Sequence, residues 1–166
     1  MQALKNERQK MDVKLINPFL EATVNVLTTM AFTETKAGKP YLKDGKEAKG
    51  DITGIISFSG DATGSLSISF TEACICGIVS NMFGEQIDSL NDEVRDAVGE
   101  LTNMISGDAR RKLQKHGYAI RAAIPSIVSG KDHIIKHHHQ GPCVALPFTT
   151  PNGEFTVEIN VKTDND

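Results

Sequence analysis

The sequence contains no tryptophan, only two tyrosines and only three cysteines. With so few large aromatic residues, we do not expect a platform on which the bases of single-stranded nucleic acid would stack. Three cysteines are too few for a disulfide scaffold, and their odd number would leave one unpaired. The simplest interpretation is a set of reduced thiols in a cytoplasmic protein.

Long apolar runs and an excess of charge of one sign are also missing. No stretch approaches the roughly 18 consecutive apolar residues of a membrane-spanning helix, and the polar first ten residues lack the apolar core of a signal peptide. The sequence has 18 Lys+Arg against 21 Asp+Glu, a formal net charge of −3. This balance does not favour binding to nucleic-acid phosphates or anionic lipid. We therefore expect a cytoplasmic protein that binds neither nucleic acid nor membrane.

The length and composition indicate one globular domain. The chain has 166 residues, of which 39% are hydrophobic and 23% are charged. These values suit a single domain with its own core. Residues 1–11 show no amphipathic spacing and are expected to be a disordered or artificially added lead-in, so the predicted domain spans residues 12–163.

Three helices are predicted from their capping residues. Asn17 suits the cap of the first helix, and Pro18 suits its first helical position. Thr71 suits the cap of a second helix. The third and longest helix is expected to begin at residues 91–93 and to end near Gly117.

Alternating apolar and polar residues predict two antiparallel hairpins, within residues 56–70 and 144–161. Another strand is expected at residues 119–124, whereas residues 35–50 and 125–130 are expected to form turns and loops. Strands joined as hairpins and combined with three helices indicate an α+β fold. We expect a largely antiparallel sheet of about six strands, with the helices packed on one face.

The third helix is predicted to carry a polar face opposite its core stripe. At about 100° per residue, Asp96, Glu100, Asn103 and Gly107 fall within a narrow arc. The expected core stripe comprises Val94, Ala97, Val98, Leu101, Met104 and Ile105. Helix positions three or four apart are neighbours, so Glu100 and Asn103 would form an exposed acid–amide pair. Spacing alone assigns no function, because most polar helix faces are simply solvated.

Gly107 lies on this polar face, one turn beyond Asn103. Glycine inside a helix costs about 1 kcal/mol relative to alanine. The missing side chain would let another backbone approach the helix at this point. Tolerated sequence drift explains the glycine equally well.

The motif Asp96-x-x-x-Glu100-x-x-Asn103, followed by Pro125, resembles the signature of the CheC/CheX/FliY phosphatases. These proteins remove phosphate from phosphorylated response regulators in bacterial chemotaxis. The chain is most similar to the CheX branch, whose members are short and dimeric. The resemblance therefore implies a homodimer that acts on a CheY-like receiver domain.

The resemblance also includes residues 17–23 and 124–130, and it extends over most of residues 11–162. Within the chain, Asn17-x-x-x-Glu21-x-x-Val24 echoes the Asp96 motif, but Val24 stands where the amide would be. If the echo is real, we expect the first helix to be structural, with Val24 in the core.

The resemblance implies roles for the acid–amide pair. Asn103 would orient the water that attacks the aspartyl-phosphate, and a neutral amide does this without adding negative charge beside the phosphoryl group. Glu100 would pair with the receiver's lysine. Asp96 and Gly107 would border the partner surface, although Asp96 also favours the helix dipole. No cofactor is expected on this chain, since the divalent ion, magnesium, belongs to the receiver.

Two alternatives remain open. The same helix face would also serve a non-catalytic module that docks a signalling partner. An unrelated small-molecule-binding or structural domain would need a large apolar pocket, which the sequence does not indicate.

Other chemically suggestive residues are better explained without a site. His133 and His137–His139 lack ligands at matched spacing, so incidental nickel or zinc binding is the expected behaviour. Cys74 and Cys76 cannot share one helix face and are expected to pack in the core. Residues 60–64 lack the Gly-Lys-Ser/Thr of a phosphate-binding loop and are expected to form a hairpin turn.

Overall fold

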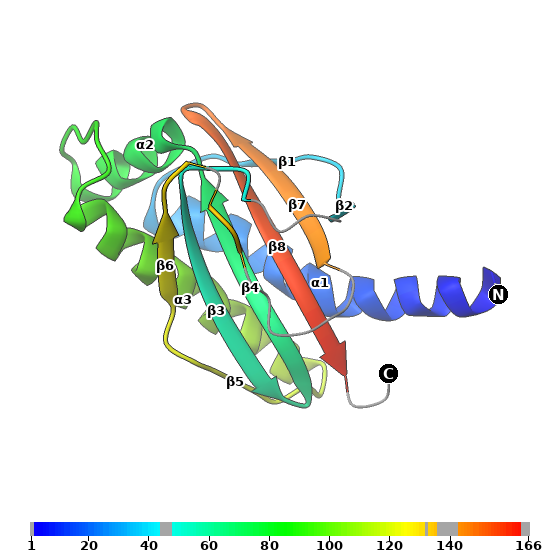
Figure 1. Cartoon of the computed structure of the whole chain (residues 1–166). Coiled ribbons are helices and arrows are strands. Elements are labelled where there is room, and N and C mark those ends of the chain that lie inside the picture. Colours follow the sequence, from blue (N-terminus) through cyan, green and yellow to red (C-terminus); the bar gives the residue numbers. More distant parts are fainter. Residues whose placement is uncertain (1, 44–47, 132, 136–142, 164–166) are drawn as a thin grey trace.

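The computed structural model describes residues 2–43, 48–131, 133–135 and 143–163, with side chains described from Lys14 onward. These residues form three helices and an eight-stranded sheet (Figure 1). In chain order the elements are α1 (Gln2–Met30), β1 (Lys36–Ala37), β2 (Tyr41–Lys43), β3 (Ile52–Gly60), β4 (Ala62–Phe70), α2 (Glu72–Phe83), α3 (Asp92–Lys115), β5 (Ile120–Ala122), β6 (Ser126–Ser129), β7 (Cys143–Thr150) and β8 (Gly153–Thr163). The α+β class is confirmed.

The sheet is antiparallel at every pairing between the described strands. Its order is β1-β7-β8-β4-β3-β5, while β2 also pairs with β7 and β6 with β3. Both predicted hairpins are present, as β3–β4 and β7–β8. Their apolar residues lie in register on one face of the sheet, as in the pairs Ile56–Leu66 and Leu146–Val157.

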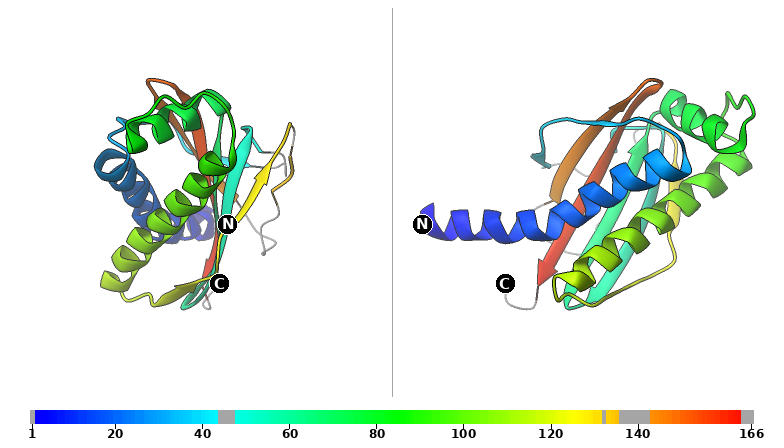
Figure 2. Two further views of the ribbon diagram at one scale, coloured as in Figure 1. Left: turned by 90° about the vertical axis from the view of Figure 1, so that its left-hand side faces the viewer. Right: turned by 180° about the vertical axis from the view of Figure 1, so that it is seen from behind.

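All three helices lie on one side of the sheet, as the edge-on view of Figure 2 shows. α1 and α3 run side by side across this face, and α2 lies at one end of it (Figures 1 and 2). The core fills the space between the helices and the sheet, with the largest fully buried side chains including Phe19, Phe70, Phe148 and Phe155. The prediction that the helices cover one face is confirmed.

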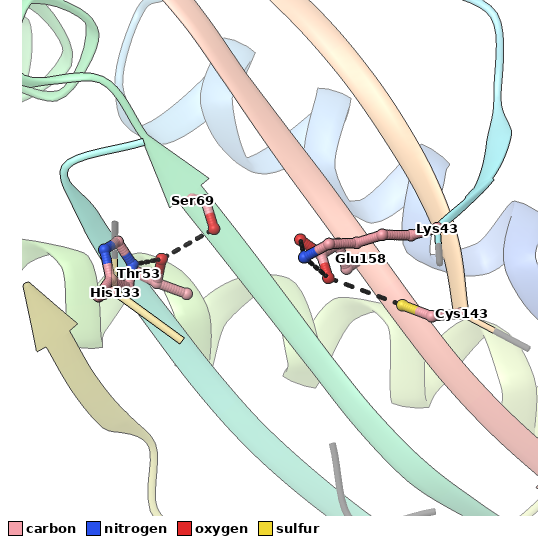
Figure 3. Close-up of polar contacts among 6 residues, drawn as sticks. All are labelled: Lys43, Thr53, Ser69, His133, Cys143 and Glu158. Carbon is pink, nitrogen blue, oxygen red and sulfur yellow. Dashed lines mark hydrogen bonds and ion pairs between the residues drawn. The ribbon is translucent and has the colours of Figure 1, made fainter. Parts of the chain in front are cut away.

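The opposite face of the sheet holds buried polar side chains. Lys43 donates hydrogen bonds to both carboxylate oxygens of Glu158, at 2.9 and 2.8 Å, and the Cys143 thiol donates to the same carboxylate at 3.7 Å (Figure 3). The Lys43 and Glu158 side chains are only 8% and 1% exposed. This ion pair therefore attaches the short strand β2 to the centre of the sheet.

A second polar group on that face contains His133 (Figure 3). The ring Nδ1 lies 2.8 Å from the carbonyl of Gly130, which only accepts hydrogen bonds, so Nδ1 carries the proton. In the neutral ring Nε2 then accepts from the hydroxyl of Thr53, whose oxygen accepts from Ser69 at 2.8 Å. His133 is thus a satisfied buried residue that attaches the segment after β6 to β3.

The beginning of the first helix was predicted wrongly. α1 begins at Gln2, so residues 2–11 are helical rather than disordered, and Pro18 lies inside the helix. The leading residues are rich in good helix formers, which a search for amphipathic spacing does not register. Figure 2 shows that α1 changes direction part-way along, as expected for a helix interrupted by proline.

Two segments predicted as turns and loops contain short strands. Residues 35–50 include β1 and β2, which pair with β7, and residues 125–130 include β6, which pairs with β3. These strands have two to four residues each. Such short edge strands form because a neighbouring strand offers free backbone groups, so their own sequences carry little pattern.

None of the three cysteines, all of which the structure describes, forms a disulfide, and Cys74 and Cys76 are buried as predicted. Burial raises the pKa of the Cys74 thiol to about 11. Burial, assisted by the charge of Glu158, raises the pKa of Cys143 to about 12. Burial also raises the pKa of Cys76. Since the thiolate is the nucleophile, all three native thiols are protonated and unreactive near neutral pH.

We therefore expect the native protein to resist an aromatic disulfide reagent at about pH 8, and all thiols to react after unfolding in guanidinium. The absorbance of the released aromatic thiolate measures both rates. Rapid labelling of the native protein would contradict the burial of Cys74 and Cys76 and the raised pKa of the partly buried Cys143.

Candidate functional site

The polar face of α3 is the candidate functional site. Asn91 caps the helix by accepting a hydrogen bond from the backbone N–H of Val94 at 2.9 Å. The predicted core stripe packs inward, with only Met104 partly exposed. This packing turns Asp96, Glu100 and Asn103 toward solvent.

Glu100 and Asn103 are both exposed and stand three positions apart on the same helix. Among the residues that the structure describes, no side-chain hydrogen bond or ion pair engages either of them. Asp96 is likewise exposed, whereas Gly107 is partly buried. The acid–amide pair is therefore free to contact another molecule.

The helix that carries this pair is held against the sheet by close contacts. Gly54 of β3 lies directly beneath Thr102, and a Cβ atom at position 54 would lie 2.1 Å from Thr102 Oγ1. That hydroxyl donates to the carbonyl of Val98 at 2.7 Å. Near the start of the helix, Arg95 Nη1 donates to Ser129 Oγ of β6 at 2.6 Å. The position of Asn103 is thus set by the contacts that other residues of α3 make with the sheet.

A shallow groove of about 370 Å³ lies between α1 and α3, and Asn103 is part of its wall. α3 also contributes Gly107 and Arg111 to the groove, and α1 contributes Asn25 and Met30. Across the groove Asn25 donates to Asp108 at 3.4 Å. Outside the groove the same two helices are connected by an ion pair between Lys112 and Glu21, at 3.7 Å. We call the lining residues and the space between them the α1–α3 groove.

Gly107 has room for a side chain within this chain. A Cβ atom at this position would have only Arg111 Nη1 within 4 Å, at 3.8 Å, which is ordinary van der Waals contact. Nothing in the described part of the chain therefore requires a glycine here. A partner that approaches the helix closely remains an explanation for it.

The second copy of the motif, on α1, does not place its valine in the core as expected. Val24 is 38% exposed, so its predicted place in the core is wrong. The reason is the orientation of α1, which buries Ala22, Thr23, Val26 and Leu27 and leaves Val24 outside. The exposed Glu21 of the echo pairs with Lys112 and therefore contributes to the contact between the two helices.

Three neighbours of the candidate site were not predicted from the sequence: Asn25, Met30 and Arg111. Arg111 stands four positions after Gly107, so helical spacing alone could have placed it on this face. Asn25 and Met30 are brought to Asn103 only by the packing of α1 against α3.

Metal-binding residues do not gather in the described part of the chain, where no group of three or more His, Cys, Asp and Glu side chains could hold an ion. His133 is engaged by Thr53 and Gly130. His137–His139 lie outside the described residues. No helix in the described part of the chain is long and apolar enough to cross a membrane.

Comparison with known proteins identifies the family. The family model described as "Chemotaxis phosphatase CheX" matches residues 52–149, which include the whole of α3. The chain belongs to the CheX family. The resemblance inferred from the Asp96–Asn103 motif is thereby confirmed, although the roles of its residues are not tested by this match.

Three relatives illustrate the similarity to CheX proteins. The "CheY-P phosphatase CheX" of Thermotoga maritima is 29% identical over 154 residues, which are 92% of this chain and 98% of that protein. The crystal structure of a CheC-like superfamily protein from a Shewanella species, strain PV-4, is 46% identical with a TM-score of 0.85, covering 90% of this chain and 98% of that one. The CheX–CheY–BeF3–Mg²⁺ complex from Borrelia burgdorferi includes a chain that is 26% identical with a TM-score of 0.75, covering 89% and 97%.

Proposed function

We propose that this chain is a phosphatase that hydrolyses the aspartyl-phosphate of a CheY-like receiver domain. The observation that carries the proposal is the exposed, unpartnered Glu100–Asn103 pair on a helix held firmly against the sheet. A relative named as a CheY-P phosphatase and the complex of a related protein with CheY support it.

In the proposed reaction a water molecule attacks the phosphorus while the bond between phosphorus and the aspartate oxygen breaks, giving inorganic phosphate and a free carboxylate. Such phosphoryl transfers depend on positioning and charge stabilisation more than on covalent chemistry. The carboxamide oxygen of Asn103 accepts a hydrogen bond from the water and holds it in line with the breaking bond. Alignment of this kind lowers a barrier by several kcal/mol.

Glu100 has a docking role in this proposal. Its negative charge lies one helical turn before Asn103 and pairs with a lysine of the receiver. A carboxylate so close to a phosphoryl group is poorly suited to act as a base, because like charges repel. Asp96 lies one turn earlier and borders the same contact surface. The receiver's own divalent ion neutralises charge on the phosphoryl oxygens, so this chain supplies no metal ligand.

The test is to incubate the purified chain with a panel of phosphorylated receivers from its own host and to follow the loss of phosphate. We expect faster loss from at least one receiver. Binding of a receiver without faster loss would favour the docking module. The mass of the protein in solution tests the homodimer, which remains a prediction.

The Gly107→Ala variant tests whether the glycine serves the stability of this chain or its contact with the receiver. Because the new methyl group meets only Arg111, and because alanine is the better helix former, we expect a gain of up to about 1 kcal/mol in the free energy of unfolding. The same methyl group would obstruct a receiver that approaches α3 closely. We therefore expect slower dephosphorylation by a more stable protein, measured by denaturant unfolding and by phosphate loss. Unchanged turnover would mean that the glycine is tolerated drift.

A further inference from the structure

An unusual residue follows the end of α1, two positions after Met30, which lines the α1–α3 groove. Phe32 has a φ of +49° and is the only non-glycine residue in the described part of the chain with a positive φ. A side chain with a Cβ atom costs about 1–2 kcal/mol in this conformation, which glycine adopts freely. Helices often end on a glycine in this conformation, and here an aromatic residue takes that place.

The cost of this conformation is not offset by packing, because Phe32 is 74% exposed. The backbone around it is nevertheless held in place. The neighbouring Thr33 is 2% exposed; its N–H donates to the carbonyl of Leu27 and its hydroxyl to that of Ala31, each at 2.9 Å. Asn81 of α2 donates to the same hydroxyl at 3.2 Å. The aromatic ring is thus presented to solvent on a fixed support.

Met30, two residues earlier, connects this feature to the candidate site. It is 52% exposed and lines the α1–α3 groove together with Asn103 and Gly107. Of the exposed large hydrophobic side chains in the described part of the chain, Met30 alone lines that groove. The end of α1 therefore carries two exposed apolar side chains within three residues, Met30 inside the groove that contains Asn103 and Phe32 two positions after it in the chain.

A protein interface of ordinary size also needs more surface area than one helix face offers. A specific complex buries about 800 Å² on each partner, which corresponds to roughly 20–30 residues. Asp96, Glu100, Asn103 and Gly107 supply only part of this area. A receiver seated on Asn103 must therefore extend over a neighbouring element, and α1 forms the other wall of the groove.

We propose that Met30 and Phe32 form an apolar anchor for the receiver domain, at a second contact beside the Asn103 site. The proposal rests on the proposed function, since it assigns the same partner. The occupant is an apolar patch on the receiver, next to its phosphorylation site. Aromatic side chains on fixed backbones contribute strongly to interfaces, because little conformational freedom is lost when they bind. Met30 and Phe32 would thus strengthen binding without taking part in the chemistry.

The test uses two variants that remove the same ring, only one of which also relieves the strained backbone conformation. Phe32→Gly removes the ring and relieves the positive-φ conformation, whereas Phe32→Ala removes the ring and keeps the conformation strained. We expect Phe32→Gly to unfold at a higher denaturant concentration than the unsubstituted protein. We expect both variants to bind the host's CheY-like receiver, loaded with Mg²⁺ and beryllofluoride, about tenfold more weakly. In turnover assays KM should rise while kcat stays unchanged.

Leu42→Ala is the matched control. Leu42 is 66% exposed but lies on β2, at an edge of the sheet away from α3 (Figure 1). Its substitution should leave receiver binding unchanged, as measured by titration calorimetry.

Each result decides between the two proposals. Unchanged binding by both Phe32 variants overturns the anchor, and the proposed function survives if the unsubstituted protein still speeds phosphate loss. Weaker binding without any turnover by the unsubstituted protein supports the anchor and overturns the phosphatase proposal. A change in the mass of the free protein, with receiver binding unaltered, would assign the patch to self-association and overturn the anchor. Failure of every host receiver to bind overturns both.

Discussion

An Asn103→Ala variant should still bind the phosphorylated receiver but should accelerate its dephosphorylation about 100-fold less than the unsubstituted protein. Removing one polar group that stabilises or positions a transition state costs about 100-fold or more in rate. The fold should be unaffected, because Asn103 is exposed and no hydrogen bond to it occurs among the described residues. Alanine is also the better helix former.

The measurement is the rate of phosphate loss with the receiver saturated by the variant, so that weaker binding cannot imitate lost chemistry. Asn103→Asp is the matched control, since it keeps the size of the side chain and adds a charge beside the phosphoryl group. We expect it to be as slow as the alanine variant. Full turnover by Asn103→Ala would remove the catalytic role and favour the non-catalytic docking module.

A Gly54→Ala variant should have the largest effect on stability. Alanine has a slightly higher strand propensity than glycine, so local preference predicts a small gain. The added methyl group would instead lie 2.1 Å from Thr102 Oγ1 and 3.2 Å from Val98 Cγ1. Because overpacking of this kind costs about 1–3 kcal/mol, we expect a net loss of that size in the free energy of unfolding.

Relief of the clash provides the check. Thr102→Ala removes the nearest atom, so the Gly54→Ala/Thr102→Ala double variant should lose less stability than the two single losses combined. Gly107→Ala is the matched glycine control for stability, because its methyl group makes only an ordinary van der Waals contact with Arg111. We also expect Gly54→Ala to slow dephosphorylation, since displacing α3 displaces Asn103. Additive losses in the double variant would show that the contact between Gly54 and Thr102 is not what limits stability.

The predictions that succeeded depended on periodicity and capping. Each hairpin turns its apolar residues to the helix-covered face of the sheet and its polar residues to the other face, so the alternation of apolar and polar residues identified both strands and their pairing. α3 has one buried stripe along its length, and the wheel predicted which side would be exposed, including Glu100 and Asn103. The motif on that exposed side then indicated the family.

Apart from the start of α1, the predictions that failed concern elements whose neighbours decide their structure. β1, β2 and β6 are short edge strands that form by pairing with β7 or β3. Val24 was expected in the core because the second copy of the motif lacks an amide there, but the rotation of α1 about its axis is set by how it packs. Neither the edge pairing nor the rotation is encoded in a short stretch of residues.

The sequence by itself determined the α+β class, the two hairpins and the exposed acid–amide pair, because each depends on the spacing of residues along a single element or turn. The tertiary structure alone decided the α1–α3 groove, the contact between Gly54 and Thr102, and the place of Met30 beside Asn103. These features join segments far apart in the chain, and their geometry follows from packing between elements, which no local pattern specifies.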